Sequence, residues 1–281
     1  MGIGEVSEKL RRSTVHVRRS GPRDAGGGSG FIWRSEGLLL TNAHVVSGAA
    51  SVSVELWDGR ELPAEVEDSD SIGDLAKLRI AASGLPHLEL REAPAHAGEQ
   101  VVAVGNPLGF TGAMTTGVVR AVGPLRGLDR RSWVQTALHL APGNSGGPLA
   151  DMQGRVVGIN TMVMRGGIAL AVPAASAKSF AMRARPPKLG VSLQEVTLRS
   201  GDRGLLVRGV AQGSRAEEAS LLAGDILLAW NGGRLERFED LQEALATNSR
   251  GVAQLRFVRG DRARIREVAV KPAAPETAGV R

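Results

Sequence analysis

Short apolar segments recur along the first two thirds of the chain, and glycine, proline and aspartate residues separate them. Several of these segments alternate between apolar and polar side chains, as a half-buried β-strand does. The segments are Ser13–Arg18, Phe31–Trp33, Gly37–Thr41, Ser51–Leu56, Val101–Val104, Gly117–Val122, Val156–Ile159 and Ile168–Val172. Many short strands joined by turns are typical of an all-β barrel or sandwich.

Helices occupy little of this region. Glu5–Arg12 has the spacing of one short amphipathic helix, and Ala174–Arg183 is the best candidate for a second. The glycine-rich run Gly26–Gly30 is expected to form a flexible turn between strands. The first part of the chain is therefore predicted to be mostly β.

The pattern of predicted strands and helices changes after Arg183. The adjacent prolines Pro186 and Pro187 cannot continue a helix. We predict a first domain over residues 1–183, a linker over 184–188, a second domain over 189–271 and a flexible tail over 272–281. In the second domain, Gly204–Val207, Asp225–Trp230 and Val252–Val258 are expected to be strands, and helices are expected from Ser214 and over Glu239–Ala246.

Composition excludes several classes of protein. The 281 residues include no cysteine, which excludes disulfides and thiolate chemistry, and no apolar run is long enough to span a bilayer. The first residues lack the pattern of a secretory signal, so we expect a cytoplasmic protein, or a periplasmic or extracellular one whose export segment was trimmed.

The net charge of +6 raises the question of a nucleic-acid partner. The positive charge comes mostly from scattered arginines, and the few aromatic residues do not interleave with them as a base-stacking surface requires. We therefore predict no specific nucleic-acid binding.

A serine lies between glycines in the run Gly143-Asn144-Ser145-Gly146-Gly147-Pro148-Leu149, directly before a predicted strand. Such a turn exposes a hydroxyl and directs backbone N–H groups into the same space. An enzyme of acyl transfer needs both, as nucleophile and as donors to the oxygen that becomes negatively charged. Alone, the same sequence could be an ordinary turn.

Two further residues complete a set in the order His, Asp, Ser. His44 lies in Thr41-Asn42-Ala43-His44-Val45-Val46, and Asp74 begins Asp74-Leu75-Ala76. Alone, each has a structural alternative, since His44 could end a strand and Asp74 could cap a turn. The other histidines lack the small-residue, strand-to-loop context of His44.

Together these motifs, with Gly105-Asn106-Pro107-Leu108-Gly109, resemble the HtrA/Deg family of serine proteases over roughly residues 5–271. The resemblance implies a trypsin-like double six-stranded β-barrel followed by a small α+β PDZ domain. It implies that Ser145 is the nucleophile, His44 the general base and Asp74 the residue that orients the imidazole, with no metal or other cofactor.

By the same resemblance, backbone N–H groups of Gly143, Asn144 and Ser145 would form the oxyanion hole. We expect Leu140, Ile168 and Ala171 to line a pocket for a small or medium aliphatic side chain. The family commonly has an aspartate where Ala137 stands and an asparagine where Ala141 stands, and these departures predict a looser active-site loop.

Residues 189–271 resemble the PDZ domain of that family. The resemblance implies that Leu189-Gly190-Val191-Ser192 binds the C-terminal carboxylate of a peptide, with Leu241 and Leu245 on the facing helix. Both leucines could instead be only core residues. The implied function is cleavage of unfolded or misfolded proteins in protein quality control. The resemblance also makes a homotrimer possible. The alternative is a catalytically weak or inactive PDZ-bearing chaperone or scaffold.

Overall fold

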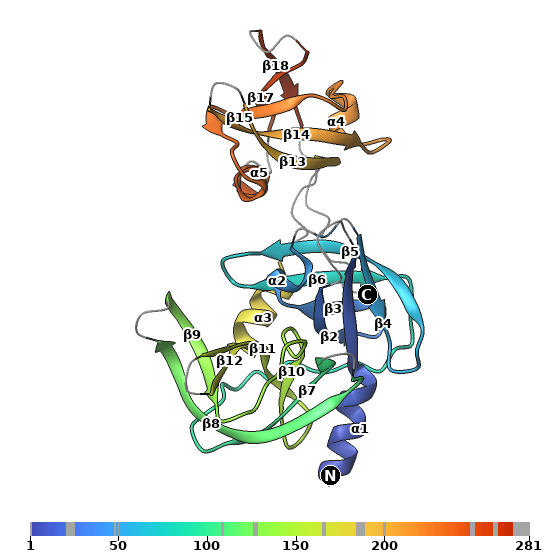
Figure 1. Ribbon diagram of the computed structural model, residues 1–281, viewed down its shortest axis with the longest axis vertical. Helices are drawn as coiled ribbons and strands as arrows, with labels where there is room; N and C mark the ends of the chain where they lie inside the picture. Colours follow the sequence, from blue (N-terminus) through green and yellow to red (C-terminus); the bar gives the residue numbers. More distant parts are fainter. Residues whose placement is uncertain are drawn as a thin grey trace. The chain divides into compact units, whose positions relative to one another are not determined.

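The computed structural model describes residues 2–20, 26–47, 49, 51–107, 110–125, 129–164, 167–183, 189–198, 201–247, 251–260 and 264–271. The chain divides into two compact units, Met1–Met182 and Arg183–Arg281 (Figure 1). The predicted linker 184–188 and tail 272–281 lie outside the described residues. In the part of the chain that is described, no helix is long and apolar enough to cross a membrane.

The first unit begins with helix α1 (Ile3–Ser13) and continues into a closed six-stranded barrel in the order β1-β2-β3-β6-β5-β4 (Figure 1). A one-turn helix, α2 (Ala43–Val46), follows β3. The strands are β1 (Thr14–Ser20), β2 (Gly27–Arg34), β3 (Leu38–Thr41), β4 (Ser51–Glu55), β5 (Glu61–Asp70) and β6 (Leu75–Ile80). All neighbouring strands are antiparallel, as expected for strands joined by short turns.

A second closed six-stranded barrel follows in the order β10-β11-β12-β9-β8-β7. Its strands are β7 (Gln100–Gly105), β8 (Ala113–Leu125), β9 (Asp129–Thr136), β10 (Pro148–Asp151), β11 (Val156–Met164) and β12 (Ile168–Pro173). Helix α3 (Ala174–Ala181) ends this unit. The prediction of a double six-stranded barrel is confirmed.

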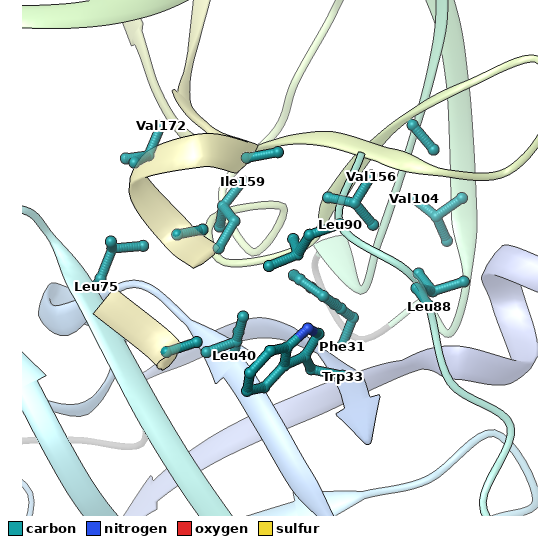
Figure 2. Close-up of a cluster of buried hydrophobic side chains, with 14 of the residues drawn as sticks. Phe31, Trp33, Leu40, Leu75, Leu88, Leu90, Val104, Val156, Ile159 and Val172 are labelled. Carbon is teal, nitrogen blue, oxygen red and sulfur yellow. The ribbon is translucent and has the colours of Figure 1, made fainter. Parts of the chain in front are cut away.

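Three apolar clusters hold the first unit together. One fills the first barrel, one fills the second, and the largest lies between them. Phe31, Trp33 and Leu40 reach this interbarrel cluster from the first barrel, and Ile159 and Val172 reach it from the second (Figure 2). Each fully buried large side chain contributes about 1.5–3 kcal/mol, so the cluster fixes how the barrels meet.

One prediction for the region near the interbarrel cluster was wrong. Gly27–Gly30 is not a flexible turn but the first half of β2, and the side chain of Ser29 is fully buried there. The glycines permit a close backbone approach: a Cβ added to Gly28 would lie 2.8 Å from the carbonyl oxygen of Ser145. Strands β5, β6 and β9 were not predicted either; β5 carries five acidic residues and half-exposed side chains, which weaken its apolar signal.

The second unit is a small α+β structure built on one sheet, in the order β13-β14-β15-β17-β18 with β16 paired to β15. Helix α4 begins as predicted, because Ser214 accepts a hydrogen bond from the Glu217 N–H at 3.3 Å. The elements are β13 (Val191–Thr197), β14 (Arg203–Val210), α4 (Arg215–Glu218), β15 (Ile226–Trp230), β16 (Gly233–Arg234), α5 (Phe238–Thr247), β17 (Ala253–Val258) and β18 (Ile265–Val270).

Candidate active site

His44 and Asp74 meet at the edge of the first barrel. The Nδ1 atom of His44 lies 2.9 Å from Oδ1 and 3.0 Å from Oδ2 of Asp74, and the backbone N–H of His44 also donates to Oδ1 at 3.1 Å. The carboxylate therefore fixes both the ring and the main chain of the histidine. The side chain of His44 is half exposed, while that of Asp74 is largely buried. The Nε2 edge of the ring is left for other chemistry.

The turn between β5 and β6 sets the position of Asp74. Asp70 and Leu75 are paired across the two strands, so Ser71–Asp74 forms the connection. Within it, the Asp70 carboxylate accepts a hydrogen bond from the Gly73 N–H at 2.7 Å. Asp74 itself has a φ of +52°, a left-handed conformation that aspartate tolerates better than most residues. This turn places the Asp74 carboxylate beside α2.

Ser145 lies in the loop between β9 and β10. The turn that leads to it is closed by a hydrogen bond from the Asn144 N–H to the Ala141 carbonyl at 3.1 Å, with Gly143 at a φ of +101°. After the serine, the Gly146 N–H donates to the Asn160 carbonyl at 2.7 Å. The left-handed φ values of Gly143 and Gly146, +101° and +87°, favour glycine at both positions.

A chain of hydrogen bonds joins Ser145 to the His44–Asp74 pair across the two barrels. The Ser145 hydroxyl donates to the Thr161 carbonyl at 2.9 Å. The amide of Asn42 donates both to the Thr161 hydroxyl at 2.9 Å and to the Asp74 carbonyl at 2.8 Å. The three predicted residues are therefore connected, although no hydrogen bond joins Ser145 to His44 within the described chain.

Packing also brings Ser145 close to His44. A Cβ added to Gly28 would lie 2.8 Å from both the Ser145 carbonyl oxygen and a methyl group of Val45, the residue after His44. The helix that carries the histidine and the loop that carries the serine are therefore direct neighbours.

Two backbone donors of the loop have no partner. Within the described residues, the N–H groups of Gly143 and Ser145 make no hydrogen bond, while the N–H of Asn144 is used inside its own turn. Of the three N–H groups predicted to bind the oxyanion, only those of Gly143 and Ser145 are therefore available to a substrate oxygen. Two such donors aimed at one oxygen would stabilise a developing negative charge.

A cavity of about 210 Å³ opens beside Ser145. Its lining residues are Leu140, Ala141, Pro142, Asn144, Ser145, Thr161, Met162 and Val163. Of the three residues predicted for a pocket, Leu140 is among these lining residues and Ile168 and Ala171 are not. Ala171 is buried inside the second barrel and Ile168 packs against the interbarrel cluster. Their place is taken by Met162 and Val163 of β11, which the sequence did not single out.

The predicted peptide-binding residues of the second unit fall into two groups. Gly190, with a φ of +82°, precedes β13, which begins at Val191. Within the described part of the chain, β13 pairs only with β14, which leaves its other edge open. Ser192 is exposed on that strand. The other group is apolar: Leu189, Leu241 and Leu245 are each at most 5% exposed and belong to the core of this unit.

Sequence reasoning missed the residues that connect the site. Asn42 and Thr161 link the two barrels, and Ser29 binds the loop of Ser145. A signal existed for Ser29, because it stands between glycines just as Ser145 does. Asn42 could have been noticed as a polar residue in an otherwise buried segment. Among the described residues, no group of three acidic, histidine or cysteine side chains could hold a metal ion.

Comparison with known proteins agrees with this geometry. The trypsin-like peptidase domain family matches residues 28–159. A probable periplasmic serine endoprotease, DegP-like, from Hahella chejuensis is 38% identical over 266 residues, covering 86% of this chain and 56% of its own length. The "putative serine protease HhoA" of Synechocystis sp. is 34% identical over 274 residues, covering 85% of this chain and 69% of its own length.

Solved structures give the same result over nearly the whole chain. The HtrA-type protease AlgW with a decapeptide is 26% identical with a TM-score of 0.59, covering 97% of this chain and 98% of its own. This chain spans little more than half the length of the Hahella relative.

Proposed function

Because this chain belongs to the HtrA/Deg family of serine proteases, we propose that it is a serine endopeptidase in which Ser145, His44 and Asp74 form the catalytic triad. The observation that carries this proposal is the double contact of the His44 Nδ1 atom with the Asp74 carboxylate, at 2.9 and 3.0 Å. That contact orients the imidazole as a general base needs.

In the proposed reaction, the Ser145 hydroxyl attacks a peptide carbonyl while His44 removes its proton through Nε2. Asp74 stabilises the imidazolium that results, and the N–H groups of Gly143 and Ser145 hold the oxyanion. The imidazolium then protonates the leaving amine, and water, activated by the same histidine, hydrolyses the acyl-enzyme. Each step uses a group that lies at the seam between the barrels.

The hydrogen bond from Ser145 to the Thr161 carbonyl suggests how substrate could start this cycle. A substrate N–H that donates to the Thr161 carbonyl would compete with the Ser145 hydroxyl for that oxygen. The displaced hydroxyl could then turn toward His44. In our proposal, the resting contact is therefore exchanged for the catalytic one when a peptide binds.

The cavity beside Ser145 supports a preference for small or medium aliphatic side chains. Leu140, Met162 and Val163 contribute apolar walls, and no residue of the cavity lining is charged. Sequencing the products of a peptide library should show aliphatic residues before the cleaved bond. A preference for arginine or lysine at that position would contradict this assignment.

We propose that the second unit is a PDZ domain that binds peptide C-termini. The open edge of β13 can add a peptide strand, and the loop at Gly190 precedes that edge. Because Leu241 and Leu245 are mostly core, the edge strand and the loop are the stronger part of this proposal. A fluorescent peptide should bind with a free C-terminus and lose affinity when the C-terminus is amidated.

We further propose unfolded or misfolded proteins as substrates, consistent with a role in quality control. The periplasmic location named for the Hahella relative favours export over the cytoplasmic alternative for this chain. A homotrimer remains a prediction that light scattering after size exclusion would measure.

The deciding experiment compares casein cleavage by the wild type with cleavage by Ser145→Ala. Loss of a triad serine lowers kcat by about 10⁶-fold in a comparable enzyme, so Ser145→Ala should show only background cleavage. Ser132→Ala, at an exposed serine of β9, is the matched control and should keep wild-type activity. Equal background rates in all three proteins would leave the alternative, a PDZ-bearing chaperone or scaffold without catalysis.

A further inference from the structure

Ser29 is a buried polar residue of the first barrel that contacts the active-site loop of the second. Its hydroxyl donates a hydrogen bond to the Gly143 carbonyl at 2.7 Å and accepts one from the Asn106 N–H at 2.8 Å. Its backbone N–H donates to the Ser145 carbonyl at 2.7 Å. The side chain is fully buried, so no water replaces these partners easily.

The backbone of Ser29 is fixed in turn by its own barrel. The Thr41 hydroxyl donates to the Ser29 carbonyl at 2.6 Å, and Ser29 is paired with His16 across β1 and β2. Ser29 therefore does not follow the loop; it offers a rigid surface on which the loop rests. We call Ser29 and Thr41 the serine–threonine clamp.

The clamp acts on the two peptide groups that flank the anion-binding donors. A trans peptide directs its C=O and N–H to opposite sides. Holding the Gly143 carbonyl toward Ser29 therefore directs the Asn144 N–H away, where it donates to Ala141. Holding the Ser145 carbonyl likewise directs the Gly146 N–H away, toward Asn160. The peptides that carry the free Gly143 and Ser145 N–H groups each adjoin a peptide held in this way.

Packing against the clamp is as tight as the hydrogen bonding. A Cβ added to Gly146 would overlap both Ser29 O and Thr41 Oγ1, and one added to Gly147 would lie 3.2 Å from Ser29 Cβ. The loop has no room to shift toward the first barrel. Its hydrogen bonds to Ser29 oppose a shift in the other direction.

We propose that Ser29 is a positioning residue for the oxyanion hole, holding the Gly143 and Ser145 donors in the orientation that the reaction requires. This inference rests on the proposed function for its kinetic consequence. Removing an oxyanion-hole donor lowers kcat by about 10²–10³-fold. Ser29→Ala keeps both donors but releases the Gly143 carbonyl, so we expect a smaller loss, on the order of 10- to 100-fold in kcat.

The test uses the full chain with an aliphatic peptide substrate and the matching peptide aldehyde, which forms a tetrahedral adduct with the serine. Ser29→Ala should lower kcat, leave KM within about twofold of wild type, and weaken the aldehyde by the same factor as kcat. Ser13→Ala is the matched control: Ser13 is equally buried, but its hydroxyl has no hydrogen-bond partner among the described residues. It should leave kcat and aldehyde affinity unchanged.

Amide hydrogen exchange over residues 141–150 gives a readout that does not depend on catalysis. Ser29→Ala should raise exchange there, and Ser13→Ala should not. If wild type and Ser145→Ala cleave equally poorly, the proposed function fails, and exchange alone decides the inference about Ser29.

Several results would overturn the proposal: unchanged kcat and exchange in Ser29→Ala, a rise in KM alone, or an equal loss in Ser13→Ala. If Ser29→Ala does not fold, Ser29→Cys replaces it, because a thiol is of similar shape but a weaker donor and acceptor. Ser29→Cys should then show the same pattern with a smaller loss in kcat, and wild-type kinetics with wild-type exchange would overturn the proposal.

Discussion

A single methyl group at Gly146 should destabilise the first unit more than the same methyl group at another glycine of nearly identical conformation. Gly146 has a φ of +87° and Gly98 a φ of +86°, so alanine suffers the same left-handed backbone strain at both, about 1–2 kcal/mol. The surroundings differ. An added Cβ at Gly98 meets nothing within 4 Å, whereas at Gly146 it overlaps Ser29 O and Thr41 Oγ1.

The difference between the two variants isolates the cost of that overlap. The two clashing atoms are the Ser29 carbonyl oxygen and the Thr41 hydroxyl oxygen. Because a hydrogen bond joins them, neither can move away alone. Overpacking of this kind costs about 1–3 kcal/mol beyond the backbone strain. For a unit of this size each kcal/mol lowers the melting temperature by about 2–4 °C. Gly146→Ala should therefore melt about 2–12 °C below Gly98→Ala.

Scanning calorimetry of the full chain measures this directly, because both substitutions lie in the first unit and affect the same transition. Gly146→Ala should also lose most peptide cleavage, since the displaced residue adjoins Ser145. Equal melting temperatures for the two variants would refute the argument that the loop rests tightly on the clamp. A larger fall in melting temperature for Gly98→Ala than for Gly146→Ala would refute it as well.

The remaining predictions concern two partly buried ion pairs. The hydrogen bond from Arg91 holds the pKa of Glu99 below its ordinary value, so Glu99 stabilises the fold above about pH 4.3, and this contribution is lost as the pH falls. The melting temperature of Glu99→Gln should fall less than that of wild type between about pH 6 and pH 3, and equal slopes would contradict this reasoning. In the second unit, Arg259 donates to the fully buried carboxylate of Asp225 at 2.6 and 2.7 Å. Arg259→Met should lower the stability of that unit by about 3–5 kcal/mol in calorimetry, whereas Arg256→Met, at an exposed arginine, should leave it unchanged.

Part of the candidate site could be predicted from the sequence because its residues lie in short, recognisable motifs. His44, Asp74 and Ser145 each lie in a short motif whose small neighbours are required by the turn that carries the residue. The double barrel was predictable for a similar reason, since strand alternation and turn residues are visible over a few positions. The acidic strand β5 was not predicted because five acidic residues outnumber its apolar positions Leu62, Ala64 and Val66.

The cavity could not be predicted in the same way, because its walls depend on register. Strands β11 and β12 are paired, and the register shifts between Asn160 and Met162. A shift of one residue exchanges the side chains that face the core with those that face outward. Thr161, Met162 and Val163, at and after this irregularity, line the cavity, while Ala171 of the partner strand is buried in the second barrel. No local pattern in the sequence marks that irregularity.

The clamp explains how the active-site loop is held although Ala137 and Ala141 offer it no polar side chain. The described hydrogen bonds of the loop involve its own backbone, Val118, Asn160, Thr161 and Ser29, and Ser29 holds the carbonyls of both Gly143 and Ser145. Ser29 and Phe31 lie on the same face of β2, because side chains two positions apart in a strand point the same way. Phe31 is fully buried in the interbarrel cluster (Figure 2). In our proposal, the orientation of the Gly143 and Ser145 donors therefore depends on how the two barrels pack, and a substitution that loosens that cluster should impair catalysis before it unfolds the protein.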